Sequence, residues 1–324
     1  MTLEVFFKLL AIFAMVALGW LSGRLGWVGG KGGAGLPGAV KALSDVAFML
    51  FVPALLFRTM AHLDFATLPW ATLVAFFVPA TAYLLAVYGL ARRRRDPSDP
   101  AAPATRTFST VYGNAVQLGI PMSAALFGAQ GLALHVAMVS LHGLLLITLL
   151  TVLVELDIAR ADRASTLGST VRATVRNAVL HPVTLPVLIG LVWNLSGIGL
   201  HPVPDQTLAL LASAVVPVCL VLIGLSLAQY GLKGRVRQAV GLSALKLGVM
   251  PAVVLVVAHF GFGLTGVPLG VVVMMAALPV GSNALIFAQR YGTGQAEATA
   301  GIVVSTIAFT ATASVWLLVL SAVG

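Results

Sequence analysis

Two short stretches of the chain place amides, hydroxyls and helix-breaking residues inside otherwise apolar segments. They are residues 109–121 and 276–283. Proline removes a backbone donor and clashes with the preceding turn, and glycine permits unusual dihedral angles, so both stretches are predicted to interrupt a helix. A backbone group without a partner costs several kcal/mol in hydrocarbon, and such a break therefore requires protein or a water-filled cavity around it. Two breaks in matching halves of a membrane protein are typical of a transporter binding site.

An interrupted helix exposes the backbone amides at the start of its second half. These amides and the helix dipole favour an anion, by about 0.3–1 kcal/mol per helix end. Asn114 could cap the second half of the first broken helix or contact a ligand, and Asn283 could do the same in the second. In the alternative interpretation both breaks are simple kinks, and the two asparagines form interhelical hydrogen bonds. We predict a substrate site where the breaks meet, formed by Gly113, Asn114, Gln117, Pro279, Gly281, Ser282 and Asn283.

Few ionisable side chains lie within the apolar segments, and each is a candidate for a role in coupling. Asp45 and Lys246 each lie about two turns from the predicted cytoplasmic end of a span. Either could carry a proton, form an ion pair or attract substrate, although Lys246 could instead extend to the membrane interface and Asp45 could cap a helix. His142 lies near the middle of its span, on the same helical face as His135. Such a pair could relay protons near neutral pH, but a hydrogen-bonded structural histidine is the commoner outcome.

The elements that would position these residues are membrane-spanning helices. Of the 324 residues, 59% are hydrophobic and 9% are charged, whereas soluble domains carry about 25% charged residues. The mean hydropathy is +1.02, and the apolar runs do not alternate with polar residues as barrel strands do. A span needs about 20 apolar residues, and the sequence therefore predicts an all-α membrane protein with ten transmembrane helices. The spans are expected at about residues 4–23, 37–58, 67–91, 104–127, 131–155, 178–199, 206–229, 238–260, 266–288 and 296–322.

The basic residues predict the orientation of the spans. Nearly all Lys and Arg residues outside the spans fall in the odd-numbered loops, including the run Arg92–Arg95. The positive-inside rule then places the odd loops in the cytoplasm and both termini outside, in a cytoplasmic membrane. The net charge of +9 is thereby explained by membrane topology, and we expect no nucleic-acid partner.

The sequence contains no motif for catalysis or for a cofactor. Cys219 is the only cysteine and lies in an apolar run, so neither a disulfide framework nor a cysteine metal site is expected. The spacings of a zinc protease, a serine hydrolase and a nucleotide-binding loop are all missing from the sequence. The loops are too short for a nucleotide-binding domain. We therefore expect neither an enzyme nor an ATP-driven pump, and no cofactor or metal.

An internal repeat is suggested by features that recur 164 residues apart. Pro53 pairs with Pro217, and Phe127-Gly128 pairs with Tyr291-Gly292. Five spans in each half would place the halves in opposite orientations, as an inverted repeat. We predict a first repeat at residues 1–155, a cytoplasmic linker at 156–177 and a second repeat at 178–324. The same offset sets Gly113-Asn114-Ala115 opposite Ala277-Leu278-Pro279.

Motifs in four of the spans carry a family resemblance. They are Phe51-Val52-Pro53-Ala54-Leu55-Leu56-Phe57, then Ser109-Thr110 with Asn114, Gly119-Ile120-Pro121 and Phe127-Gly128, then Val216-Pro217 with Gly224-Leu225-Ser226-Leu227, and finally Ala276-Ala277-Leu278-Pro279 with Gly281, Phe287-Ala288 and Tyr291-Gly292. With these motifs the chain resembles the auxin efflux carrier family. This family includes the plant auxin efflux carriers and bacterial permeases for malonate or other organic acids. The resemblance covers essentially the whole chain.

The resemblance implies a specific architecture. The first, second, sixth and seventh spans would form a scaffold and a homodimer surface, and the third to fifth and eighth to tenth would form a transport domain. The fourth and ninth spans would cross as broken helices, with Asn114 contacting a substrate carboxylate. Plant members often have Pro where this chain has Gly113, and Gln where it has Val280. The missing Gln weakens any inference that auxin is the ligand, and the short linker resembles the bacterial members.

These observations predict a secondary transporter of small organic anions, such as dicarboxylates or auxin-like acids, with an elevator-type mechanism. The expected partners are the anion, the lipid bilayer and a second copy of the chain. One alternative is a sodium-coupled symporter of the bile-acid type, which would favour carboxylates or further polar groups at the crossing. An anion channel or a membrane sensor is the alternative from another class.

Overall fold

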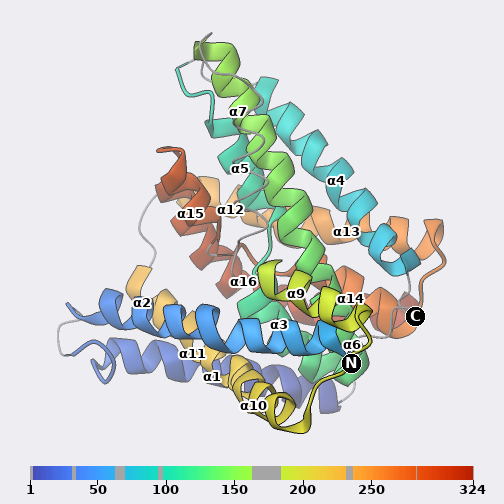
Figure 1. The fold of residues 1–324 in the computed structure, drawn as a ribbon. Coiled ribbons are helices and arrows are strands. Elements are labelled where there is room, and N and C mark those ends of the chain that lie inside the picture. Colours follow the sequence, from blue (N-terminus) through green and yellow to red (C-terminus); the bar gives the residue numbers. More distant parts are fainter. Residues whose placement is uncertain are drawn as a thin grey trace. The chain divides into compact units, whose positions relative to one another are not determined.

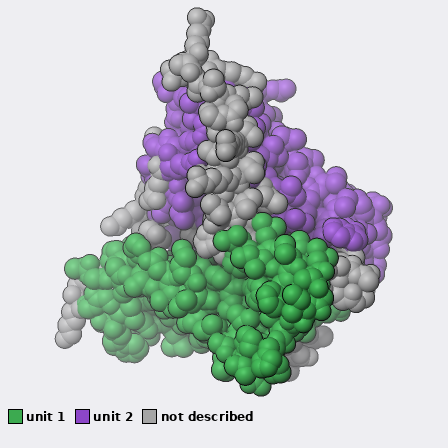
Figure 2. Space-filling view, viewed as in Figure 1, with its two compact units in different colours: residues 1–68, 115–140, 180–231 green, residues 69–114, 141–179, 232–324 purple. Residues whose placement is uncertain are grey.

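All secondary-structure elements of the described residues are helices. A computed structural model describes residues 3–30, 34–62, 70–93, 98–162, 184–230, 236–281 and 283–323. Within these ranges there is no strand, and the one β-type contact is an isolated bridge. Figure 1 shows the helices. Short π-helical segments, called η in the text, adjoin several of them. The chain divides into two compact units, which are coloured separately in Figure 2.

Six helical stretches are long and apolar enough to cross a membrane, and Gly266–Ala277 is a shorter apolar helix. The six are Leu36–Ala61, Trp70–Arg93, Ala115–Val139, Pro202–Gln229, Val236–Gly261 and Gln295–Val323. The prediction of an all-α protein with multiple membrane-spanning helices is therefore confirmed for the described residues. The count of ten spans stays a prediction.

Unit 1 comprises residues 1–68, 115–140 and 180–231. Its helical segments are α1 (Leu3–Arg24), α2 (Leu36–Val46), η1 (Ala47–Phe51), α3 (Val52–Ala61), η2 (Ala115–Gly119), most of α6 (Ile120–His142), α9 (Thr184–Leu195), α10 (Pro202–Ser213) and α11 (Val215–Tyr230). Helices α1 and α11 meet backbone to backbone, since a Cβ added at Gly19 would lie 2.2 Å from the carbonyl oxygen of Val221. In the reverse direction, a Cβ added at Gly224 in α11 would lie 2.0 Å from the carbonyl oxygen of Val16 in α1. Small residues of this kind allow membrane helices to pack closely.

Unit 2 comprises residues 69–114, 141–179 and 232–324. Its helical segments are α4 (Trp70–Arg93), α5 (Ala102–Val111), η3 (Gly143–Ile147), α7 (Thr148–Asp162), α12 (Val236–Ala244), η4 (Leu245–Val249), α13 (Met250–Val256), η5 (Val257–Gly261), α14 (Gly266–Ala277), α15 (Asn283–Arg290) and α16 (Gln295–Val323). Both α5 and α14 are almost completely buried. A helix that is buried on nearly all sides is a central element of a bundle, and each of these two ends at one of the predicted breaks.

Two glycines at the predicted repeat offset share an unusual backbone conformation. Gly128 has φ 65° and interrupts α6, and Gly292 has φ 70° and follows α15. Positive φ favours glycine because a side chain would clash with the backbone. The predicted end of the fourth span at residue 127 lies next to this kink, but the apolar stretch Ala115–Val139 continues across it, so this boundary stays a prediction.

The region between the predicted repeats is only partly described. Helix α7 continues through Asp162, seven residues beyond Glu155, where the first repeat was expected to end. The rest of the predicted linker at 156–177 lies outside the described residues. The repeat boundaries and the inverted relationship of the halves stay predictions.

Candidate functional site

Both predicted breaks are present, and both lie at the ends of buried helices. Helix α5 ends at Val111, and Tyr112 turns into an extended conformation with φ −87° and ψ 108°. Helix α14 ends at Ala277, and Leu278 follows with φ −55° and ψ 144°. The next helical segments are η2, which begins at Ala115, and α15, which begins at Asn283.

The two breaks lie side by side and are joined through their backbones. Gly113 and Val280 form an isolated antiparallel bridge. The N–H of Asn114 donates to the carbonyl of Pro279 at 2.7 Å, and the N–H of Gly281 donates to the carbonyl of Tyr112 at 3.3 Å. Each break therefore supplies partners for backbone groups that the other leaves open, which is what an interrupted helix in an apolar environment requires.

The bridge is tightly packed at a glycine in each of its two segments. A Cβ added at Gly113 would lie 3.0 Å from the Cβ of Leu278 and 3.4 Å from Lys246 Nζ. A Cβ added at Gly281 would lie 3.1 Å from the carbonyl oxygen of Gly113. A larger residue at either position would push the two segments apart, so the glycines serve close backbone approach.

Lys246 brings a buried ammonium group to the bridge. It lies in η4 and is fully buried rather than extended to the membrane interface. Its Nζ donates to the carbonyl of Ala276, in the last turn of α14. A helix C-terminus carries partial negative charge and favours a cation there. This hydrogen bond uses one of the three ammonium donors. The Lys246 Nζ also lies within van der Waals distance of the position that a side chain at Gly113 would occupy.

The ring of Tyr112, which adjoins the bridge, packs against two other aromatic rings. Tyr112 packs against His142, with ring centroids 4.2 Å apart, and against Phe108 at 4.8 Å. The side chains of Tyr112 and Asn283 are hydrogen-bonded. His142 is buried. The tyrosine thus links the first break to the first residue of α15, which follows the second break.

The remaining predicted residues belong to unit 1 or are not described. Gln117 is a buried residue of η2 in unit 1. Asp45 is exposed, in the same unit, and forms an ion pair with Lys41 at 2.6 Å. His135 Nε2 lies 2.8 Å from the carbonyl oxygen of Ala115, also within unit 1. Ser282 lies outside the described residues.

Sequence reasoning missed two groups that complete the bridge. Ser305 in α16 accepts a hydrogen bond from the N–H of Val280 at 2.9 Å, and the carbonyl of Ala276 receives the lysine. A buried serine in an apolar helix is a weak sequence signal, because serine there commonly bonds to its own helix. A backbone carbonyl carries no sequence signal at all.

The part of the chain that the structure describes has no group of three or more His, Cys, Asp or Glu residues placed to hold a metal ion. A family model described as membrane transport protein matches residues 4–317. A comparison with curated proteins gives no match.

Proposed function

Because the chain belongs to the membrane transport protein family, the family of the auxin efflux carriers, we propose that it is a secondary transporter of small organic anions. The observation that carries this proposal is the bridge between Gly113 and Val280 with the buried Lys246 beside it. The substrate carboxylate binds at this bridge. Nearly all of the chain is matched by the family model, so the proposal concerns the substrate and the mechanism rather than the class of protein.

Three features of the bridge favour an anion. The Nζ of Lys246 supplies a buried donor, which carries a positive charge in its protonated form. Helix α15 begins at Asn283, directly after the second break, and a helix N-terminus presents N–H donors and partial positive charge. The half-buried Asn114 adds an amide next to the bridge. Hydrogen bonds that involve a charged group contribute about 1.5–3 kcal/mol each, so three such donors together contribute about 4.5–9 kcal/mol, which spans the range from millimolar to micromolar binding of a carboxylate.

The mechanism that we propose is alternating access in which the binding site moves as part of one body. All groups of the bridge belong to unit 2, including Lys246, Ser305 and Asn283. Helices α1 to α3 and α9 to α11 belong to unit 1, which also contains residues 115–140. Unit 1 serves as the scaffold, and unit 2 carries the site between the two faces of the membrane. The transporter acts as a homodimer through unit 1, in a cytoplasmic membrane with both termini outside.

Sodium coupling is the weaker proposal. A sodium ion would bind to oxygen ligands such as the free carbonyls of a helix end. At the end of α14 the carbonyl of Ala276 already accepts from Lys246. A fixed ammonium there takes the place of a cation, and this supports transport that does not depend on sodium. Transport into proteoliposomes with and without a sodium gradient tests the choice.

The substitution Asn114→Ala tests the proposed site. We expect the purified wild-type protein to be stabilised against heat by one or more small carboxylates, and the variant to fold but to lose this stabilisation. Asn194→Ala is a matched control, because Asn194 donates to the carbonyls of Met60 and Ala61 within unit 1. The control should lower the melting temperature without removing the response to carboxylate. Wild-type affinity in Asn114→Ala would refute the site.

A further inference from the structure

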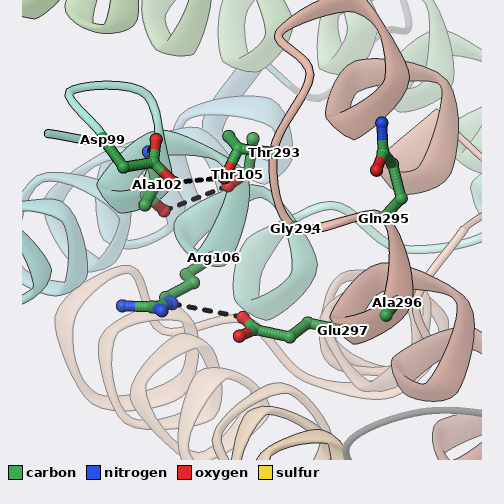
Figure 3. A pocket seen from close by; sticks show the side chains of 9 residues that line it. All are labelled: Asp99, Ala102, Thr105, Arg106, Thr293, Gly294, Gln295, Ala296 and Glu297. Atoms are coloured by element: carbon green, nitrogen blue, oxygen red, sulfur yellow. Dashed lines mark hydrogen bonds and ion pairs between the residues drawn. The ribbon is translucent and has the colours of Figure 1, made fainter.

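A polar cavity lies within unit 2, away from the bridge. Its volume is about 320 Å³. Figure 3 shows that residues from the start of α5 and from the segment around the start of α16 line it together. Both segments border loops that the positive-inside rule places in the cytoplasm. Four side chains at this cavity, here called the polar cluster, are Asp99, Arg106, Thr293 and Glu297.

The polar cluster joins the two segments by side-chain contacts. Thr293 Oγ1 donates to Asp99 Oδ2 at 2.5 Å, and the other oxygen of Asp99 accepts from the N–H of Ala102 at 3.1 Å. One carboxylate therefore caps α5 and holds the turn after α15. Arg106 Nε donates to Glu297 Oε2 at 3.2 Å and ties the second turn of α5 to the first turn of α16.

Helices α5 and α15 connect the polar cluster to the bridge. Helix α5 runs from the cluster to Tyr112 over ten residues, about 15 Å, and α15 runs back from the second break to the turn before Thr293. Between these two ends the helices touch through Phe108 and Phe287, whose ring centroids are 4.7 Å apart. Helices α5 and α15 are thus held together at both ends, by the bridge at one end and by the polar cluster at the other.

We propose that the polar cluster is a positioning site, which sets the geometry of the bridge by holding the turn after α15 on the start of α5. This inference rests on the proposed binding of a carboxylate at the bridge. Tyr112 follows α5 directly, and no loop separates them. A shift at the start of α5 is therefore carried along the rigid helix to the backbone groups of the bridge. The polar cluster touches no substrate and acts through α5.

A pair of substitutions at Thr293 separates positioning from folding. Thr293→Val keeps the shape but removes the donor, whereas Thr293→Ser keeps the hydroxyl. Because Thr293 acts on the bridge only through α5, a part of the lost hydrogen-bond energy reaches the binding site. We therefore expect the Val variant to show a KM for carboxylate uptake about three- to tenfold higher at an unchanged maximal rate. The Ser variant should match the wild type. Thr299→Val is the control, since Thr299 bonds to the carbonyl of Gln295 in its own helix.

A cross-link tests the same inference without relying on a lost bond. A Cβ added at Gly294 would lie 3.5 Å from the Cβ of Thr105, within the range of a disulfide. In a Cys219→Ala background, the oxidised Thr105→Cys/Gly294→Cys protein should keep its KM, and oxidation should reverse the effect of Thr293→Val. The reduced form of each protein is the reference, because Gly294 has φ 73° and a side chain there is strained.

The outcomes distinguish this inference from the proposed function. If Thr293→Val keeps the wild-type KM while Asn114→Ala loses binding, the positioning role is wrong and the substrate site stands. If oxidation of the cysteine pair stops transport, the turn must leave α5 during the cycle, and the positioning role is again wrong. If Asn114→Ala binds carboxylate like the wild type, the proposed site itself is refuted.

Discussion

Gly113 and Val280 come from opposite halves of the chain and pair as an antiparallel bridge. The hydrogen bonds on either side of this pair satisfy backbone groups of Tyr112, Asn114, Pro279 and Gly281. In an apolar bundle these groups would otherwise be buried without partners. The bridge is therefore the reason that two broken helices are tolerated.

The first prediction concerns close approach at the bridge. Gly113→Ala would bring a methyl group to 3.0 Å from the Cβ of Leu278, and overpacking of this kind costs about 1–3 kcal/mol. We expect a lower melting temperature and weaker carboxylate binding. Gly241→Ala in α12 is the matched control, because nothing lies within 4 Å of its added Cβ. If the two variants have equal melting temperatures, the two backbone segments of the bridge can move apart without loss of stability.

The second prediction separates charge from packing at Lys246. Lys246→Met removes the ammonium and keeps most of the volume. Replacing a buried charge by an apolar side chain is often neutral or stabilising, so the melting temperature should be unchanged or higher. Carboxylate affinity should nevertheless fall at least tenfold, by about 1.4 kcal/mol or more, as measured by isothermal titration. The exposed Lys41 offers the control Lys41→Met, which should bind normally. Normal binding by Lys246→Met would exclude the ammonium from the site.

The third prediction concerns the serine that supports the second break. Ser305→Ala removes the acceptor for the N–H of Val280. A buried donor without a partner costs about 1–3 kcal/mol, so thermal unfolding should shift to lower temperature. Hydrogen exchange should be faster at the amide of Val280 than in the wild type. Ser321→Ala is the control, because Ser321 is exposed and bonds to its own helix. Unchanged exchange at Val280 would mean that the serine does not stabilise the break.

Much of the helical organisation follows from local sequence. Apolar length predicts the spans, and the proline and glycine content of residues 109–121 and 276–283 predicts where two of them break. The offset of 164 residues also recurs in the observed elements: α5 begins at Ala102 and α14 at Gly266. These features depend on short-range steric and solvation effects, which neighbouring residues determine.

The partners across the site could not be predicted in the same way. The repeat offset sets Gly113 opposite Ala277, whereas in the structure Gly113 pairs with Val280. An offset relates equivalent positions in two halves, but contact depends on how the halves pack. For the same reason the acceptor of Lys246, the carbonyl of Ala276, was not foreseen.

By itself, the sequence determined that this is an all-helical membrane protein of a transporter family with two interrupted helices, because hydrophobic length and helix-breaking residues act locally. The tertiary structure decided which backbone groups meet, that Lys246 is buried beside Gly113, and that Asp45 is exposed instead. Such contacts join residues far apart in the chain. They are settled by the packing of whole helices, where every buried polar group must find a partner.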